Sequence, residues 1–173
     1  LHLSSAASDV YKRQINKPLD TSVVLIGFDE ISSLDKISNS IFEYDIEAIE
    51  FFTFNSLTKV QEAFDQVEVG HLKNNYYLIV ELYDQKGFTN FLEKIYTDNL
   101  AQEIIVSTNN AQKKSIWQYR LLISESITRS RPIKLDIAVP LKNITKLIEK
   151  LELFFKDKKS YDLVLFGHIL SLI

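Results

Sequence analysis

Arg120, Ser124 and Lys134 are the residues whose types and spacing predict a binding site for an anion. Arg120 and Ser124 are four positions apart, so on one helix their side chains would point the same way. A guanidinium fork suits a carboxylate because it can donate two parallel hydrogen bonds, and a hydroxyl can add another. The same pattern is also typical of solvated residues on amphipathic elements, with Lys134 paired to Asp136.

Residues 116–140 are predicted to form the helix, turn and strand that position these side chains. One helical stripe is apolar: Ile116, Tyr119, Ile123 and Ile127. A second stripe, about 100° around the axis, carries the polar candidates: Trp117, Arg120, Ser124 and Thr128. After Pro132, residues 133–139 alternate apolar and polar side chains, which predicts a half-buried strand with Lys134 facing away from its apolar side.

The rest of the chain predicts strands that alternate with helices. Apolar runs predict strands at 23–27, 46–54, 76–83, 103–107 and 161–168, with helices between them. Asn109 or Asn110, and later Asn143, are placed to cap two of these helices. Periodicity alone does not separate two fold classes; the one we expect is α+β, a ferredoxin-like antiparallel sheet with β-α-β units and helices packed on it. A doubly wound α/β sheet is the alternative, although no Gly-rich phosphate turn follows any strand.

Composition narrows the function classes. The 173 residues suit one domain or two small ones, and a net charge of -3 gives no reason to expect nucleic acid as a partner. The absence of cysteine excludes disulfides and thiolate metal sites, and it fits a reducing compartment. No apolar run reaches the roughly 20 residues of a transmembrane helix. We expect residues 1–14 and 169–173 to be non-native flanks around one domain at 15–168.

From about Val23 to His168 the sequence resembles the C-terminal cap domain of FAD-linked oxidases of the vanillyl-alcohol-oxidase type. The group it resembles most is the D-2-hydroxyacid dehydrogenases, which include D-lactate and D-2-hydroxyglutarate dehydrogenases and the glycolate oxidase flavin subunit. Five motifs in order carry the resemblance: AIEFF around Glu50, YYLIVEL, W-x-x-R-x-x-I-S-E-S from Trp117, K-x-D-x-x-V-P from Lys134, and F-G-H ending at His168.

The resemblance implies roles for four residues. Arg120, Ser124 (where Thr is common) and Lys134 would hold the substrate carboxylate, although the turn before Lys134 is a residue shorter than in many relatives. His168 would be the first histidine of H-x-G-D-G-N-x-H, which helps to hold a divalent metal, expected to be Zn. Residues 169–173 read ILSLI instead, so this metal site would be incomplete. Glu50 matches a recurring family position, or is a buried carboxylate with structural hydrogen bonds.

The resemblance also implies a reaction. A D-2-hydroxyacid would be oxidised to its 2-oxoacid by FAD, which a separate N-terminal domain would mainly bind, and an unidentified acceptor would take the electrons. The domain at 15–168 would itself supply no catalytic residue. A homodimer, and a place in the cytoplasm or at the periphery of the inner membrane, are compatible with the family. The alternative is a non-catalytic ferredoxin-like domain that binds an acidic metabolite or a protein partner.

Overall fold

The computed structural model describes residues 20–41, 43–68, 71–83 and 85–169. The expected flank at 1–14, and residues 170–173 of the second flank, lie outside this part of the chain. The strands are β1 (Ser22–Phe28), β2 (Ile46–Thr53), β3 (Tyr76–Leu82), β4 (Glu103–Val106) and β5 (Phe166–His168). The helices are α1 (Ser32–Ile41), α2 (Phe54–Ala63), α3 (Gln85–Thr97), α4 (Asn110–Leu121), α5 (Ile123–Ser126) and α6 (Ile144–Phe155), with 3-10 turns η1 (Thr128–Ser130) and η2 (Leu141–Asn143).

The strands form one sheet in the order β4-β1-β3-β2-β5, and its pairings are all antiparallel. The order of the first four strands is that of a ferredoxin-like fold, in which α1 joins β1 to β2 and α3 joins β3 to β4. This confirms the predicted α+β class. The doubly wound alternative is wrong, because that fold requires mostly parallel strands.

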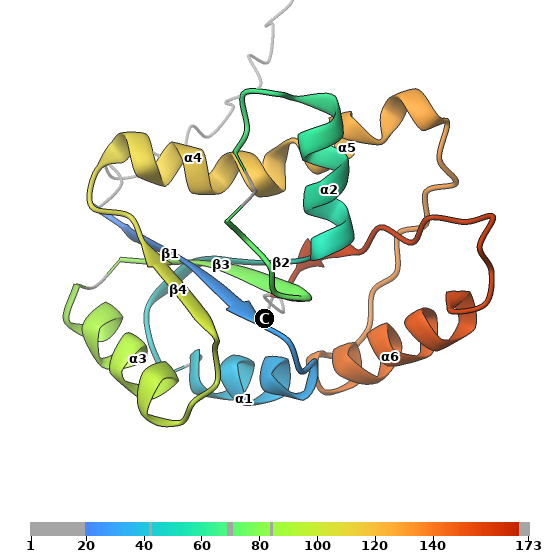
Figure 1. Ribbon diagram of the computed structural model, residues 1–173. Helices are drawn as coiled ribbons and strands as arrows, with labels where there is room; N and C mark the ends of the chain where they lie inside the picture. The colour runs from blue at the N-terminus through green and yellow to red at the C-terminus, as the bar shows by residue number, and fades with distance from the viewer. Residues whose placement is uncertain (1–19, 42, 69–70, 84, 170–173) are drawn as a thin grey trace, which may run out of the picture.

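Helices cover both faces of the sheet, as Figure 1 shows, with α2, α4 and α5 on one side and α1, α3 and α6 on the other. Successive side chains of a strand point to opposite faces, so each strand contributes to two cores. One core joins α1, α3 and α6 to Val24, Ile26, Phe28, Leu78 and Val80. The other joins α2, α4 and α5 to Val23, Leu25, Phe52, Tyr77 and Ile79.

The predicted apolar stripe of the 116–127 helix is confirmed. Ile116, Tyr119, Ile123 and Ile127 are all buried, although the helix divides at Leu122 into α4 and α5. Asn109 caps α4 as predicted, since its side chain accepts a hydrogen bond from the Gln112 backbone N–H at 3.0 Å. Asn143 stands before α6 but makes no capping hydrogen bond, so that part of the prediction is wrong.

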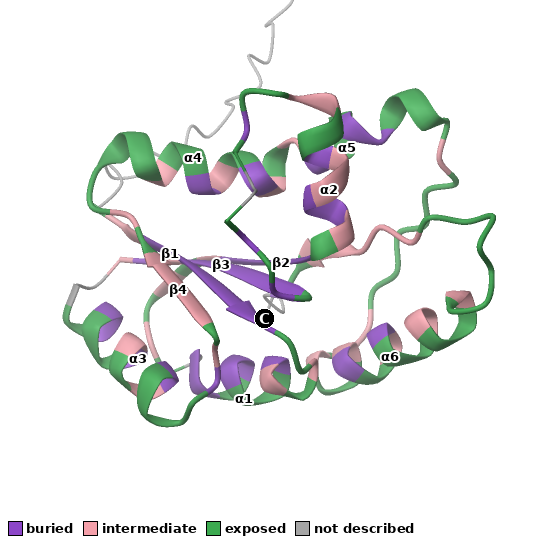
Figure 2. Ribbon diagram, in the orientation of Figure 1, coloured by how far each residue is buried: buried purple, intermediate pink, exposed green. Residues whose placement is uncertain are grey.

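The strand predicted at 133–139 is also wrong. These residues pair with no strand in the described part of the chain, and Figure 2 shows the connection between η1 and η2 as largely exposed. Ile133 is 84% exposed and Leu135 76%. Alternating polarity favours an extended backbone, but a strand also needs a partner, and β5 already occupies the outer edge of β2.

The last strand is shorter than predicted, Phe166–His168 rather than 161–168. The preceding backbone is held by the start of α2 instead. The Leu165 carbonyl accepts hydrogen bonds from the Thr53 N–H at 3.1 Å and from the Ser56 hydroxyl at 3.0 Å. Ile169, just after β5, is buried and donates its N–H to the Ile49 carbonyl at 3.0 Å. No helix of the described residues has the length and apolarity to cross a membrane.

Candidate functional site

The polar site centres on Glu50, which lies within β2 and is only 4% exposed. Its Oε2 accepts a hydrogen bond from Arg120 Nε at 2.6 Å. Its other oxygen, Oε1, contacts Nδ1 of His168. One buried carboxylate therefore joins two of the residues that the sequence singled out, Arg120 and His168.

Strand register and helix packing explain why these side chains meet. In the antiparallel pairing of β2 with β5, Glu50 lies opposite His168 and Phe52 lies opposite Phe166. Opposing residues on neighbouring strands point to the same face of a sheet, here the face covered by α4. Arg120, in the last turn of α4, places its guanidinium carbon 4.7 Å from the centre of the Phe166 ring. This cation–π contact and the Glu50 carboxylate orient the guanidinium together.

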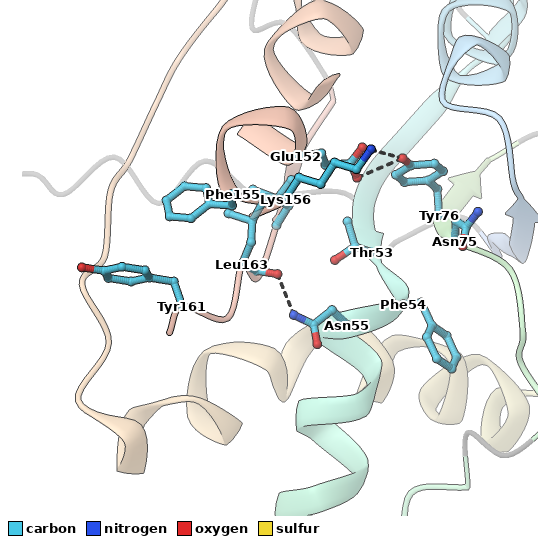
Figure 3. Close-up of a pocket in the computed structure, with 11 residues that line it drawn as sticks. Thr53, Phe54, Asn55, Asn75, Tyr76, Glu152, Phe155, Lys156, Tyr161 and Leu163 are labelled. Carbon is cyan, nitrogen blue, oxygen red and sulfur yellow. Dashed lines mark hydrogen bonds between the residues drawn. The ribbon is translucent and has the colours of Figure 1, made fainter. Parts of the chain in front are cut away.

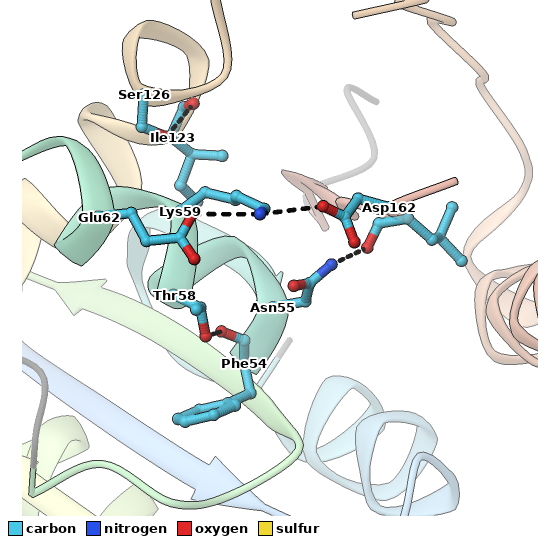
Figure 4. Close-up of polar contacts among 9 residues, drawn as sticks. Phe54, Asn55, Thr58, Lys59, Glu62, Ile123, Ser126 and Asp162 are labelled. Atoms are coloured by element: carbon cyan, nitrogen blue, oxygen red, sulfur yellow. Dashed lines mark hydrogen bonds and ion pairs between the residues drawn. The ribbon is translucent and has the colours of Figure 1, made fainter. Parts of the chain in front are cut away.

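The segment that leads into β5 is fixed against α2. Asn55 donates its side-chain N–H to the Leu163 carbonyl at 2.7 Å, and Lys59 pairs with Asp162 at 2.9 Å (Figure 4). The hydrogen bond from Lys59 to Asp162, reinforced by Glu62, raises the pKa of Lys59. These contacts set the register in which His168 reaches Glu50.

Ser124 and Lys134 are not joined to this cluster. Ser124 is exposed on α5, one turn beyond Arg120, and its backbone carbonyl accepts a hydrogen bond from the Thr128 hydroxyl at 2.8 Å. Lys134 is exposed in the extended 131–140 connection and forms no hydrogen bond or ion pair with another described residue. This geometry does not test whether Ser124 or Lys134 binds a substrate carboxylate, so both roles stay predictions.

A second carboxylate lies on the same face of the sheet and was not singled out by the sequence. Glu81 in β3 accepts a hydrogen bond from Trp117 Nε1 at 2.9 Å and contacts the hydroxyl of Thr21. Trp117 and Arg120, three residues apart on α4, thus each reach a carboxylate on the sheet. The available signal was a charged residue inside an apolar strand, which Glu50 and Glu81 share.

A cavity of about 420 Å³ lies elsewhere, between the start of α2 and the end of α6 (Figure 3). It is lined by residues that include Thr53, Asn55, Tyr76 and Glu152, and by none of the predicted site residues. The Tyr76 hydroxyl donates to Glu152 at 2.7 Å, and burial, followed by this hydrogen bond, raises the pKa of Tyr76. This phenol stays neutral. Lys156 also lines the cavity, so a cation is present there, close to Glu152.

The predicted metal is not supported by the described residues. They contain no group of three or more His, Cys, Asp or Glu side chains that could hold an ion. His168 and Glu50 provide only two such groups, and they contact each other. A catalytic zinc site has three protein ligands, so the arrangement does not fit a metal by itself.

The described residues also do not fit a dinucleotide cradle. Such a cradle places a Gly-rich turn between a parallel strand and the N-terminus of a helix. The pairings here are antiparallel, and Gly27 and Gly167, the glycines of the described strands, lie within β1 and β5 rather than in such a turn.

These features define the class: an α+β domain of ferredoxin-like topology with an Arg–Glu–His cluster at β5, one edge of its sheet. Residues 17–171 match the family described as "FAD linked oxidases, C-terminal domain". The chain belongs to that family, and the resemblance read from the motifs is confirmed.

Two curated relatives are consistent with this. The chain is 23% identical over 164 residues to a protein named D-2-hydroxyglutarate dehydrogenase from Xanthomonas citri pv. viticola, covering 91% of this chain and 34% of the relative. It is 21% identical over 161 residues to a protein of the same name from Stutzerimonas stutzeri, covering 88% of this chain and 34% of the relative. The chain thus spans about a third of the length of these relatives.

Proposed function

We propose that this chain is the substrate-binding part of an FAD-dependent dehydrogenase that oxidises a D-2-hydroxyacid to the 2-oxoacid. Family membership supports an oxidoreductase that uses FAD. The names of the two relatives support a substrate that carries both a hydroxyl and a carboxylate. Lactate, glycolate and 2-hydroxyglutarate all have this chemistry, and the proposal covers the class.

The observation that carries the proposal is the state of Arg120. Its Nε is bonded to Glu50 and its face lies on Phe166, whereas its two terminal nitrogens form no hydrogen bond with another described residue. Those terminal nitrogens form the edge that binds a carboxylate through two parallel hydrogen bonds. The side chain is 14% exposed, so part of it remains in contact with solvent.

Charge balance explains why further groups are needed. Glu50 neutralises Arg120 at 2.6 Å, so the pair alone offers an anion little net attraction. A substrate carboxylate would gain its attraction from Lys134, with a hydroxyl hydrogen bond from Ser124. FAD, when bound, supplies the oxidation chemistry, and the residues of this chain hold and orient the acid. The metal predicted beside His168, the electron acceptor, a homodimer and a site at the inner membrane stay predictions.

The test uses the protein encoded by the whole reading frame that contains this chain, purified with its flavin. D-lactate, D-2-hydroxyglutarate and glycolate are assayed with an artificial electron acceptor, and 1,2-propanediol serves as the matched alcohol that lacks the carboxylate. We expect oxidation of at least one acid and none of the diol. Lys134→Ala should raise KM about tenfold or more, the loss of one charge-assisted hydrogen bond, while Lys142→Ala should change nothing.

Two results would refute the proposal. One is equal oxidation of lactate and propanediol, which would show that no residue of the protein recognises the substrate carboxylate. The other is a protein without bound flavin that still binds the acids, which would favour the alternative, a non-catalytic ferredoxin-like domain for an acidic metabolite. If the flavin-free protein bound none of the acids, the form of the alternative in which the domain binds a protein partner would be favoured instead.

A further inference from the structure

The Glu50 carboxylate contacts two partners at once, one through each of its oxygens. Oε2 accepts from Arg120 Nε at 2.6 Å, and Oε1 contacts His168 Nδ1. The two partners come from α4 and β5, far apart in the sequence. Glu50 itself is 95% buried at the side chain, so both oxygens depend on these partners rather than on water.

We infer that Glu50 is a positioning residue, which orients the Arg120 fork and holds His168 in the tautomer that presents a free Nε2 electron pair. The value of this orientation for catalysis rests on the proposed function. The contacts of Glu50 with Arg120 and His168 do not depend on it. Glu50 is assigned no contact with the substrate and instead holds the side chains of Arg120 and His168 in fixed orientations.

The effect on His168 follows from hydrogen-bond chemistry. The hydrogen-bond partner of one ring nitrogen decides which nitrogen of an imidazole carries the hydrogen. A carboxylate has no hydrogen to give, so Nδ1 must donate, and in the neutral imidazole Nε2 is left with its electron pair. His168 is 76% exposed at the side chain, so water would otherwise leave its tautomer and its rotation unrestrained. The bond to Glu50 is what can fix both.

The effect on Arg120 follows from the same carboxylate. Binding at Nε leaves the opposite edge of the guanidinium, with its two terminal nitrogens, for a ligand. The Phe166 ring restricts rotation about the remaining axis, because it covers one face at 4.7 Å. Phe166 and His168 are both residues of β5, two apart and therefore on the same face. The short strand β5 therefore provides both His168 itself and the Phe166 ring that restricts Arg120.

A merely structural role for Glu50 is the competing explanation. A buried carboxylate could simply dock α4 on the sheet, and stability measurements would not distinguish the two roles. The tautomer of His168 does distinguish them, since docking of α4 requires only the bond to Arg120. His71 is exposed and forms no hydrogen bond with another described residue, although its charge acts on Glu103, so it serves in the same sample as a histidine whose tautomer no hydrogen bond fixes.

The experiment is nitrogen NMR on the uniformly 15N-labelled 173-residue chain, at a pH of about 8 where an ordinary histidine is neutral. Long-range proton–nitrogen correlation shows which ring nitrogen carries the hydrogen. We expect the Nδ1–H form of His168 to exceed the Nε2–H form about tenfold, as one charge-assisted hydrogen bond would give. We also expect the Arg120 Nε–H to exchange slowly with water. His71 should show neither restriction.

Glu50→Gln is the decisive variant, because its amide presents an oxygen to one partner and an NH2 group to the other, so it cannot accept from Arg120 with one atom and from His168 with the other. His168 should then lose its excess of the Nδ1–H form, whereas Glu47→Gln, an exposed residue of the same strand, should change nothing. A wild-type His168 that already matches His71, or a His168 ratio unaltered in Glu50→Gln, would overturn the inference. Should Glu50→Gln not fold, the wild-type ratio decides alone. No substrate is needed, so failure of the proposed function would appear separately, as missing oxidation.

Discussion

Arg120 Nε lies 2.6 Å from Glu50 Oε2, so α4 and β2, 70 residues apart in the sequence, are joined by a charge-assisted hydrogen bond inside the molecule. The side chains are 14% and 5% exposed. At this depth neither charge can be satisfied by water alone once its partner is removed. The pair is therefore both a structural link and the core of the proposed site.

Removing one charge of this pair should be costly. We expect Arg120→Ala to lower the free energy of unfolding by about 3 kcal/mol, because it leaves a buried carboxylate without its main partner. The double variant Arg120→Met with Glu50→Gln should recover most of this loss. His168→Ala should cost less than about 1 kcal/mol, since that imidazole is largely exposed. Urea unfolding measures all three, and a loss from Arg120→Ala as small as that from His168→Ala would contradict the prediction.

Glu103 should make stability depend on pH. Burial raises the pKa of its carboxyl above 4.5, opposed by His71, and its Oε2 is buried without a hydrogen-bond partner among the described residues. Because the folded state then binds the proton more tightly than the unfolded state, stability falls as pH rises from 4.5 through the raised value. Glu103→Gln should therefore stabilise by about 1 kcal/mol at pH about 7 and by nothing at pH about 3.

The control for this prediction is Glu47→Gln, which removes an exposed charge of β2. Its effect should stay within about 0.5 kcal/mol at both pH values. Thermal unfolding at the two pH values is sufficient. A gain from Glu103→Gln that persists at low pH would show that something other than the ionised carboxylate was removed.

The two asparagines before helices should differ in their contribution. Asn109 accepts a hydrogen bond from the Gln112 backbone, whereas Asn143 makes no capping bond. We expect Asn109→Ala to destabilise by about 1 kcal/mol and Asn143→Ala by less than about 0.5 kcal/mol. Equal losses, measured by urea unfolding, would contradict the capping difference.

The 133–139 connection should exchange its backbone hydrogens quickly. These residues form no strand pairing in the described part of the chain, and Ile133 and Leu135 are exposed. The backbone N–H groups of β3, which pairs on both sides, should exchange on the order of a thousandfold more slowly, at a stability of several kcal/mol. Hydrogen-exchange mass spectrometry with peptides from both segments measures this. Comparable protection would show that the connection is paired in solution.

Local patterns in the sequence were sufficient for several features. The stripe of Ile116, Tyr119, Ile123 and Ile127 predicted burial because a helix repeats every 3.6 residues whatever it packs against. The motifs predicted the family, and family membership carried the α+β fold with it. The pairing of Arg120 with a ligand stays a hypothesis, because a position on a helical stripe does not show what lies opposite.

Tertiary structure alone decided which candidates meet. Residues 133–139 show the same alternation of apolar and polar side chains as a real strand. A strand forms, however, only where a second backbone supplies hydrogen bonds. In the same way, Glu50 and His168 became neighbours through the register of β2 with β5, which no local pattern specifies. The sequence thus determined the family and the helical faces. The contacts of Glu50 with Arg120 and His168 required the folded sheet, because they join residues whose separation only strand pairing and helix packing can close.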